Sequence, residues 1–133
     1  MSRSGIRDAF ARYGATLRNV QWSVSAWTPA QELVVSEWQH HYRPGPQQTA
    51  EYAGSLSRWS GPGNKEFREN LECAHRERSV LRLVIVSTPE TDRVESGEDA
   101  SRIPKDFHVR EDLVGEVVSL AADEYVLRFR RRS

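Results

Sequence analysis

The stretch LVGEVVSLAADEYVLRFRR, which spans residues 113–131, decides the fold class of this sequence. In its second half, Tyr125, Leu127 and Phe129 occupy every other position, as in a strand that buries one face. Residues 121–124, Ala-Ala-Asp-Glu, have the polar character of a turn and separate this half from the first. The stretch therefore predicts an antiparallel β-hairpin.

Three segments outside this hairpin also have the pattern of strands. Residues 20–28 and 32–42 both alternate and are separated by a polar turn, so they predict a second antiparallel hairpin. Residues 80–87 are almost continuously apolar, which is typical of a strand that is covered on both faces. The predicted strands therefore lie near 20–28, 32–42, 80–87, 113–119 and 125–131.

Two segments have the pattern of helices. Residues 4–13 predict a short opening helix that ends at a glycine. Residues 64–78 predict the best helix of the chain, because Asn64 is a good N-cap residue and Phe67 and Leu71 recur at helical spacing. Residues 47–59 fit a helix about as well as a strand.

The length of 133 residues and the order of these segments indicate one domain, residues 1–133. We predict a single α+β domain with a curved, mainly antiparallel sheet of about five strands and two or three helices.

The net charge of zero hides a strongly acidic segment. Residues 90–124 contain four basic and eleven acidic side chains, a net charge of −7. Within this segment, apolar residues are too sparse before the last hairpin to offset the entropy lost on ordering. We therefore predict a mobile acidic loop at about residues 89–106.

The location of the protein is indicated by its cysteine content and hydropathy. The single cysteine, Cys73, excludes an internal disulfide and is typical of a reducing compartment. The longest apolar run, residues 80–86, is too short for a membrane span, and the N-terminus lacks the apolar core of a secretion signal. We expect a soluble cytoplasmic protein with no membrane partner.

No motif for catalysis, a metal or a cofactor stands out. His40 and His41 are neighbours on a predicted strand and would point to opposite faces, so they are not expected to share a metal ion. We predict no metal, no cofactor and no catalytic residue, and we favour a non-enzymatic role. One enzymatic alternative stays open, a metal-dependent nuclease whose carboxylates are Glu37 and Glu116.

The loop of residues 57–65 has the composition of an anion-binding site. Its glycines let backbone amides approach a ligand, and the start of the following helix presents free N–H groups. Basic side chains flank the loop, and a tryptophan offers a stacking face. A well-capped helix after a tight loop would have the same composition. The candidate contacts are Arg58, Trp59, Gly61, Gly63, Asn64 and Lys65.

The hairpin predicted at residues 20–28 and 32–42 has an unusual number of aromatic side chains. If its strands pair, Trp27 would join Trp38, His40 and Tyr42 on one sheet face, a surface suited to an unstacked base. The alternative is that the helices cover this face. A small curved sheet with an aromatic face resembles in architecture the PUA-like and SRA-like readers of modified bases, although no motif is shared.

The arginine-rich end of the chain adds two candidate phosphate contacts, Arg128 and Arg130. A solvated edge strand that is protected from aggregation by charge would have the same pattern. We therefore predict a small nucleic-acid-binding module that contacts DNA or RNA and recognises an exposed or modified base. The alternatives are the nuclease named above and a protein-interaction or assembly module. The interaction module would use acidic residues 90–112 to bind a protein partner or a second copy of the chain.

Overall fold

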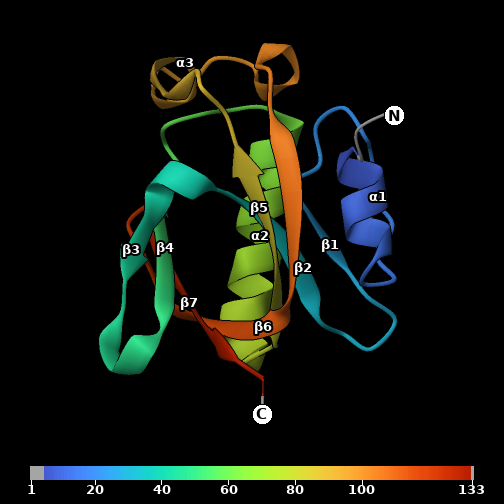
Figure 1. Ribbon diagram of the computed structural model, residues 1–133, viewed down its shortest axis with the longest axis vertical. Coiled ribbons are helices and arrows are strands. Elements are labelled where there is room, and N and C mark those ends of the chain that lie inside the picture. The colour runs from blue at the N-terminus through green and yellow to red at the C-terminus, as the bar shows by residue number, and fades with distance from the viewer. Residues whose placement is uncertain (1–4, 133) are drawn as a thin grey trace.

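The computed structural model of the protein describes residues 5–132 and contains one sheet with helices packed on it (Figure 1). The α-helices are α1 (Ile6–Ala11), α2 (Pro62–Glu77) and α3 (Thr91–Glu95), and the 3-10 helices are η1 (Gln39–His41), η2 (Pro46–Gln48) and η3 (Ala100–Arg102). The strands are β1 (Ser25–Trp27), β2 (Leu33–Trp38), β3 (Tyr42–Pro44), β4 (Ala50–Ser55), β5 (Leu81–Ser87), β6 (Asp106–Ala121) and β7 (Glu124–Arg131).

The sheet has seven strands in the order β1-β2-β5-β6-β7-β4-β3. Both predicted hairpins are present, as β1-β2 and β6-β7, and the strand predicted at residues 80–87 is β5, but β1 and β2 are shorter than the predicted ranges 20–28 and 32–42. The predicted number of about five strands is wrong, and the sheet is mixed, although most of its neighbouring pairs are antiparallel as predicted. Its pair β2-β5 is parallel and the other five neighbouring pairs are antiparallel.

One of the two additional strands, β4, comes from residues 47–59, which the sequence left ambiguous, and the other, β3, begins at residue 42, where the strand predicted over residues 32–42 was expected to end. Strand β4 pairs with β7, and β3 pairs with β4 at the edge of the sheet. The opening helix is also shorter than predicted: α1 covers residues 6–11, and its predicted start at Ser4 lies outside the described residues.

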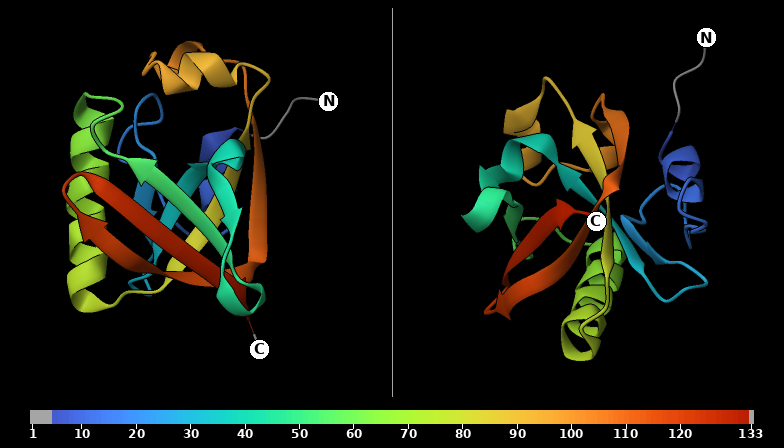
Figure 2. Two further views of the ribbon diagram at one scale, coloured as in Figure 1. Left: turned by 90° about the vertical axis from the view of Figure 1, so that its left-hand side faces the viewer. Right: turned by 60° about the horizontal axis from the view of Figure 1, so that its bottom comes forward.

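Strand β6 curves the sheet. Its first half pairs with β5 and its second half with β7, and the pairing register shifts within each ladder. Such irregularities bend a strand and increase its local twist. As a result, β7 and β4 curl over towards the side on which α2 lies, as Figure 2 shows.

The concave side of the curved sheet encloses the main core. Helix α2 contributes Phe67, Leu71 and Ala74, which pack with β-strand residues that include Leu127 and Phe129. A second, smaller core lies on the other face of the sheet, where α1 packs on β1, β2 and β5. It contains Ala9, Phe10, Ala15, Leu17, Ala26, Val34 and Val84.

Helix α2 begins two residues earlier than predicted. Gly61 is its N-cap residue and has a φ of 107°, which only glycine adopts without strain. Pro62 follows at the first helical position, where its missing N–H costs nothing. Asn64 is therefore not the N-cap. It is buried, and its Nδ2 donates a hydrogen bond to the Leu56 carbonyl oxygen at 2.8 Å.

Replacement of Gly63 by alanine should destabilise the protein. A Cβ atom at this position would lie 2.2 Å from the backbone carbonyl oxygen of Trp22, so α2 would have to move away from the segment that precedes β1. We expect a loss of about 1–3 kcal/mol in the free energy of unfolding, the usual cost of forcing extra volume into a packed site. Urea denaturation would measure it, and Lys65→Ala, an exposed substitution in the same helical turn, should change stability by less than about 0.5 kcal/mol. Equal stability of the two variants would contradict the close approach.

The acidic segment between β5 and β6 is more structured than predicted. It contains α3 and η3, and two of its side chains, Val94 and Ile103, are buried. Arg93 pairs with Glu98 through two hydrogen bonds, so part of the negative charge is neutralised within the segment. The predicted mobility of this segment stays a prediction.

None of the helices in residues 5–132 combines the length and the apolar character needed to cross a membrane.

Candidate functional site

A buried carboxyl group lies at one end of the main core. Glu37 is on the same face of β2 as Leu33 and Val35, and only 3% of its surface is exposed. The Tyr125 hydroxyl donates to its two carboxyl oxygens at 3.0 and 3.1 Å. Burial raises the pKa of Glu37 to about 8, although the Tyr125 hydrogen bond and the charge of Arg58 favour ionisation. Glu37 is therefore mostly protonated at neutral pH.

The predicted nuclease pair does not form. Glu116 lies on β6 opposite Arg128 of β7, and its side chain is exposed. Glu37 is on β2, two strands away, and its side chain points into the core. The sequence suggested a pair because both residues lie on strands, but alternation places their side chains on opposite faces of the sheet.

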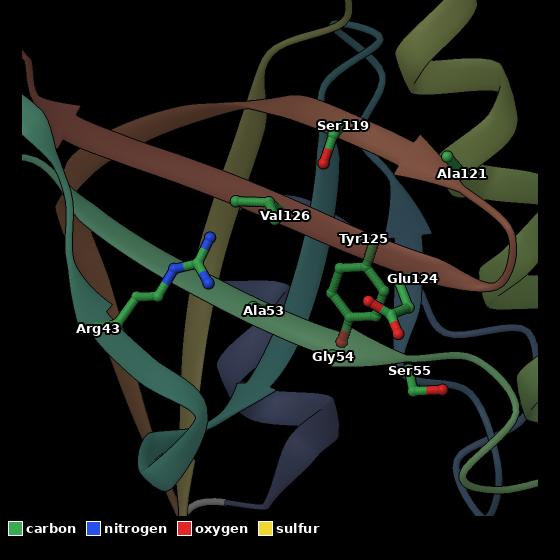
Figure 3. A pocket seen from close by; sticks show the side chains of 9 residues that line it. All are labelled: Arg43, Ala53, Gly54, Ser55, Ser119, Ala121, Glu124, Tyr125 and Val126. Atoms are coloured by element: carbon green, nitrogen blue, oxygen red, sulfur yellow. The ribbon is translucent and has the colours of Figure 1, made fainter.

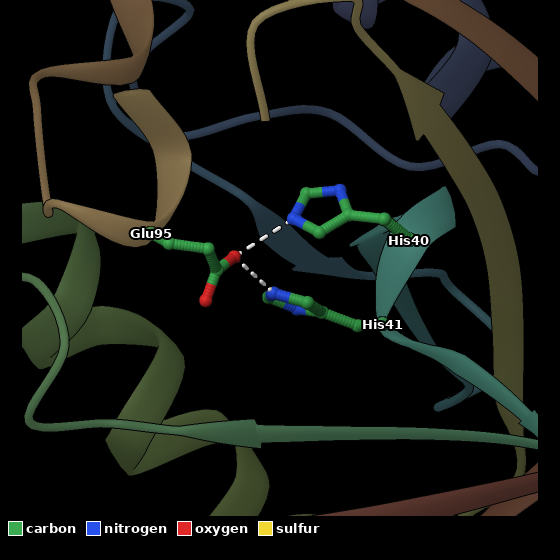
Figure 4. Close-up of side chains that lie close together, drawn as sticks. All are labelled: His40, His41 and Glu95. Atoms are coloured by element: carbon green, nitrogen blue, oxygen red, sulfur yellow. Dashed lines mark hydrogen bonds and ion pairs between the residues drawn. The ribbon is translucent and has the colours of Figure 1, made fainter. Parts of the chain in front are cut away.

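Three side chains, two from η1 and one from α3, meet at one point, as Figure 4 shows. The Nε2 atoms of His40 and His41 each lie 2.7 Å from the same Oε2 atom of Glu95. The prediction that the two histidines diverge is wrong, because residues 39–41 form the 3-10 helix η1 rather than the end of a strand. Glu95 was missed because it lies in α3, far from the histidines in the sequence.

Burial and the hydrogen bonds between these side chains shift the pKa values of His41 and Glu95. Burial lowers the pKa of His41, and the hydrogen bond from its ring to Glu95 acts in the opposite direction. Burial alone would raise the pKa of Glu95, but the hydrogen bonds from His41 and His40 outweigh it and leave this pKa lowered. His41 Nδ1 is buried and has no hydrogen-bond partner within residues 5–132.

Arg58 points inward and not towards a ligand in solvent. Its Nη1 donates to the Val94 carbonyl oxygen at 2.7 Å, and its charge acts on Glu37, His41 and Glu95. The structure therefore gives this predicted phosphate contact a second role, which is to hold α3 against the sheet.

The other predicted contacts in the 57–65 loop differ in how far they are buried. Trp59 packs on the core residue Phe67 with a ring-centroid separation of 6.4 Å. Gly63 and Asn64 are buried, whereas Gly61 and Lys65 are exposed. Of the six predicted contacts of the loop, Gly61 and Lys65 are thus exposed, Arg58 and Trp59 are partly buried, and Gly63 and Asn64 are buried; their role in binding stays a prediction.

The predicted aromatic face is split. The β1-β2 register pairs Trp27 with Leu33, on the core side of the sheet, where Trp27 Nε1 donates to Asn70 of α2 at 3.1 Å. Trp38 is five positions beyond Leu33 and therefore faces the other side. Of the four residues predicted to share this face, only the side chains of Trp38 and His40 form a ring contact with each other among residues 5–132, with ring centroids 6.2 Å apart.

Tyr42 belongs instead to a hollow of about 400 Å³ between β3-β4 and β6-β7, which we call the arginine–tyrosine hollow. All its charged lining residues are arginines: Arg110, Arg130 and Arg131. Tyr42 is 50% exposed, and its ring contacts that of buried Tyr52 at a centroid separation of 5.9 Å. The other lining residues are Gln39, Gln48, Thr49, Ala50, Ile85, Leu113 and Phe129.

The arginines of this hollow carry more positive charge than their acidic neighbour neutralises. Asp112 accepts two hydrogen bonds from Arg110, at 3.0 and 2.9 Å, and lies 3.9 Å from Arg131. Arg130 is exposed, and its side chain makes no hydrogen bond or ion pair with the described part of the chain. The sequence indicated Tyr42 and Arg130. Arg131 belongs to the same arginine-rich end but was not among the candidates, and Arg110 was missed because it lies on a different strand, β6.

Arg128, the other predicted phosphate contact, is already paired. It donates to buried Glu51 at 2.8 Å from Nε, and Arg43 donates to the second oxygen of the same carboxylate at 2.9 Å. These hydrogen bonds, above all the one from Arg128, keep the pKa of Glu51 below its usual range. Arg128 therefore stabilises the pairing of β4 with β7.

A second surface hollow, of about 480 Å³, lies over β4 and β7 (Figure 3). It is open to solvent and lined mainly by small side chains, with Arg43 and Glu124 at its sides. Beneath it, the Tyr125 ring passes Gly54, where a Cβ atom would lie 2.6 Å from the Tyr125 hydroxyl oxygen. Gly54 therefore makes room for the ring that reaches Glu37.

Comparisons of the chain with protein-family models, with curated proteins and with solved structures found no significant match.

Proposed function

We propose that this protein binds single-stranded nucleic acid in the arginine–tyrosine hollow. The observation that carries the proposal is that Arg110, Arg130 and Arg131 line the same hollow as one exposed tyrosine, with no acidic lining residue among residues 5–132. In the proposed complex the arginines contact phosphates and Tyr42 stacks on an unpaired base.

The arginines support the phosphate part of this proposal. A guanidinium group is planar and can give a phosphate two parallel hydrogen bonds, which a lysine cannot do. Arg130 has no competing partner in residues 5–132, and Arg110 and Arg131 share the single carboxylate of Asp112. A net positive charge therefore remains to attract a polyanion.

Tyr42 supports the base part. Half of its surface is exposed, while its contact with Tyr52 holds the ring in place. Stacking on such a ring is possible for any base but requires that the base be unpaired, which favours single strands over a duplex. Recognition of one modified base in the manner of the PUA-like and SRA-like proteins would be a more specific form of this proposal.

Fluorescence anisotropy of a labelled oligo-dT of about ten nucleotides, within the site size of small binding domains, would test the proposal. Three arginine contacts predict a slope of about −2 for log affinity against log salt, so the affinity should fall about 20-fold between 50 and 200 mM salt. Tyr42→Ala should cost about 1–3 kcal/mol of binding free energy. Arg130→Ala should reduce the magnitude of the salt slope by about 0.7.

Two control variants locate the contact. Arg7→Ala removes an exposed arginine from α1, which lies on the other side of the molecule from β3 in Figure 1, and should leave binding unchanged. Lys65→Ala tests the 57–65 loop, and we expect no effect from it. A loss of affinity in Lys65→Ala with none in Tyr42→Ala would move the site to the loop. Absence of binding by the wild type at low salt would reject the proposal.

A further inference from the structure

The His40, His41 and Glu95 cluster brings three ligand atoms to one point (Figure 4). One ring nitrogen from each histidine and one carboxylate oxygen all lie within 4.8 Å of one another. The histidines approach from η1 and the carboxylate from α3, so the point lies between two segments of the chain. The cluster is separate from the arginine–tyrosine hollow, because none of its three residues lines that hollow.

The 3-10 helix η1 explains how two adjacent histidines can both direct a ring nitrogen towards the same carboxylate oxygen. Neighbouring side chains in a 3-10 helix are rotated by about 120° from each other, compared with about 180° in a strand. The ring centroids of His40 and His41 are 4.5 Å apart, and both Nε2 atoms face Glu95.

The kinds of atoms in the cluster define the metal that it would take. Two imidazole nitrogens with one carboxylate oxygen suit zinc and neighbouring first-row divalent metals, whereas magnesium and calcium prefer oxygen alone. Three protein ligands are also the number found in sites that keep one position for water or a substrate. Exposure of 50% of the Glu95 side chain leaves the cluster accessible from solvent.

The observed spacing requires a small adjustment. Ligand atoms of a tetrahedral site with bonds of about 2.1 Å lie about 3.4 Å apart. The Nε2–Oε2 separations are 2.7 Å, so Glu95 would withdraw slightly as the ion enters. Half of the Glu95 side-chain surface is exposed to solvent, so the carboxylate has room for a movement of this size.

Arg58 limits the affinity. Its guanidinium acts on both His41 and Glu95, and it is held in place by the carbonyl of Val94, the residue before Glu95. A nearby positive charge opposes the binding of a cation. We therefore expect weaker binding than in a structural site made of thiolates.

We propose that His40, His41 and Glu95 bind a first-row divalent transition-metal ion, and that the ion joins α3 to η1. The ion would take the place of the two histidine–glutamate hydrogen bonds and fix the connection between β5 and β6 to the body of the sheet. This site is independent of the proposed nucleic-acid contact.

Calorimetric titration of the full chain with Zn²⁺, after removal of metals with a chelator, would test the site. Loss of a residue that merely supports a metal ligand costs about 10–100-fold in affinity, so His40→Ala, His41→Ala and Glu95→Gln should each cost at least about tenfold. His75→Ala, which removes an exposed histidine from α2, is the matched control and should bind as the wild type does. Visible absorption of the Co²⁺ form would identify the ligands as nitrogen and oxygen.

Thermal unfolding separates metal binding from a merely structural role of the cluster. Zn²⁺ should raise the midpoint of the wild type and of His75→Ala, but not that of the three ligand variants. If His41→Ala fails to fold, the more exposed His40 and Glu95 variants still decide the question. No binding of Zn²⁺ at millimolar concentration, or unchanged affinity in His40→Ala and Glu95→Gln, would overturn the proposal.

Discussion

Replacement of Glu37 by glutamine is expected to flatten the pH dependence of stability between about pH 5 and about pH 8. The carboxyl group is buried against Tyr125, and its pKa is raised to about 8 in the folded protein. In the unfolded chain it has the ordinary value of 4.5. Between these two values the folded state holds one more proton than the unfolded state, so stability falls as pH rises.

Because the pKa of Glu37 is higher in the folded protein, its contribution to stability becomes less favourable as pH rises. Below pH 4.5 Glu37 is protonated in both the folded and the unfolded state, and its ionisation does not reduce the free energy of unfolding. Above about pH 8 it is ionised in both states, and the full penalty of a buried carboxylate reduces the free energy of unfolding. At about 1.4 kcal/mol for each pH unit between the two pKa values, the difference approaches about 5 kcal/mol. Glutamine keeps an oxygen that accepts the Tyr125 hydrogen bond but cannot ionise, so Glu37→Gln should become increasingly more stable than the wild type as pH rises.

Urea denaturation at several pH values, compared between variants, would measure this difference. His41 and Glu66 also have shifted pKa values, but they are present in both proteins and cancel in the comparison. Glu116→Gln removes an exposed carboxylate from the neighbouring part of the sheet and should leave the wild-type pH profile unchanged. Parallel profiles for the wild type and Glu37→Gln would show that the carboxyl group is not held protonated in the core.

The second large effect is expected at Phe67. This side chain of α2 is 2% exposed and makes an edge-to-face contact with Tyr125, with ring centroids 5.5 Å apart. It also touches Trp59, so it joins the helix, the curled strand β7 and the loop before α2. Phe67→Ala should reduce the free energy of unfolding by about 3–5 kcal/mol, the usual cost of removing a buried aromatic ring.

Glu69→Ala is the control for this substitution. Glu69 is exposed on the same helix, and alanine favours the helical state, so stability should change by less than about 0.5 kcal/mol. Comparable losses in the two variants would mean that Phe67 does not connect α2 to the curved sheet.

The elements that were predicted correctly are those with a complete local signal. Strand β5 is apolar except for Arg82 and its last residue, as expected for a strand covered on both faces, and β7 alternates with every second residue buried, as expected for a strand with one face in the core. Helix α2 has apolar residues at helical spacing along one face. Its start was misplaced because Asn64, a residue common at N-caps, is used here to bind a loop carbonyl.

The elements that were missed depend on distant partners. Strand β4 contains Glu51 and Gly54, which give no hydrophobic alternation, and its place is set by pairing with β7. The ion pairs of Glu51 and the room that Gly54 leaves for Tyr125 become visible only in the folded structure. The parallel pairing of β2 with β5 similarly joins segments that are far apart in the sequence.

The same distinction applies to the candidate sites. Tyr42 and Arg130 could be selected by residue type, but Arg110, which lines the same hollow, comes from a different strand. The histidine cluster could not be predicted, since it requires a 3-10 turn and a carboxylate from α3. The partial burial of Trp59 against Phe67 could not be predicted, because an aromatic residue beside a glycine-rich loop has the same sequence pattern whether it is exposed or packed, and its stacking role stays a prediction.

The most direct test of the proposed function is an NMR titration of the isotope-labelled protein with oligo-dT at low salt. Our account predicts that the largest amide shifts occur around the arginine–tyrosine hollow, at Tyr42, Arg110, Arg130 and Arg131. These shifts should disappear in Tyr42→Ala at the same oligonucleotide concentration, because the stacking contribution is lost. Largest shifts in residues 57–65, or no shifts at all, would contradict the assignment of the hollow as the nucleic-acid site.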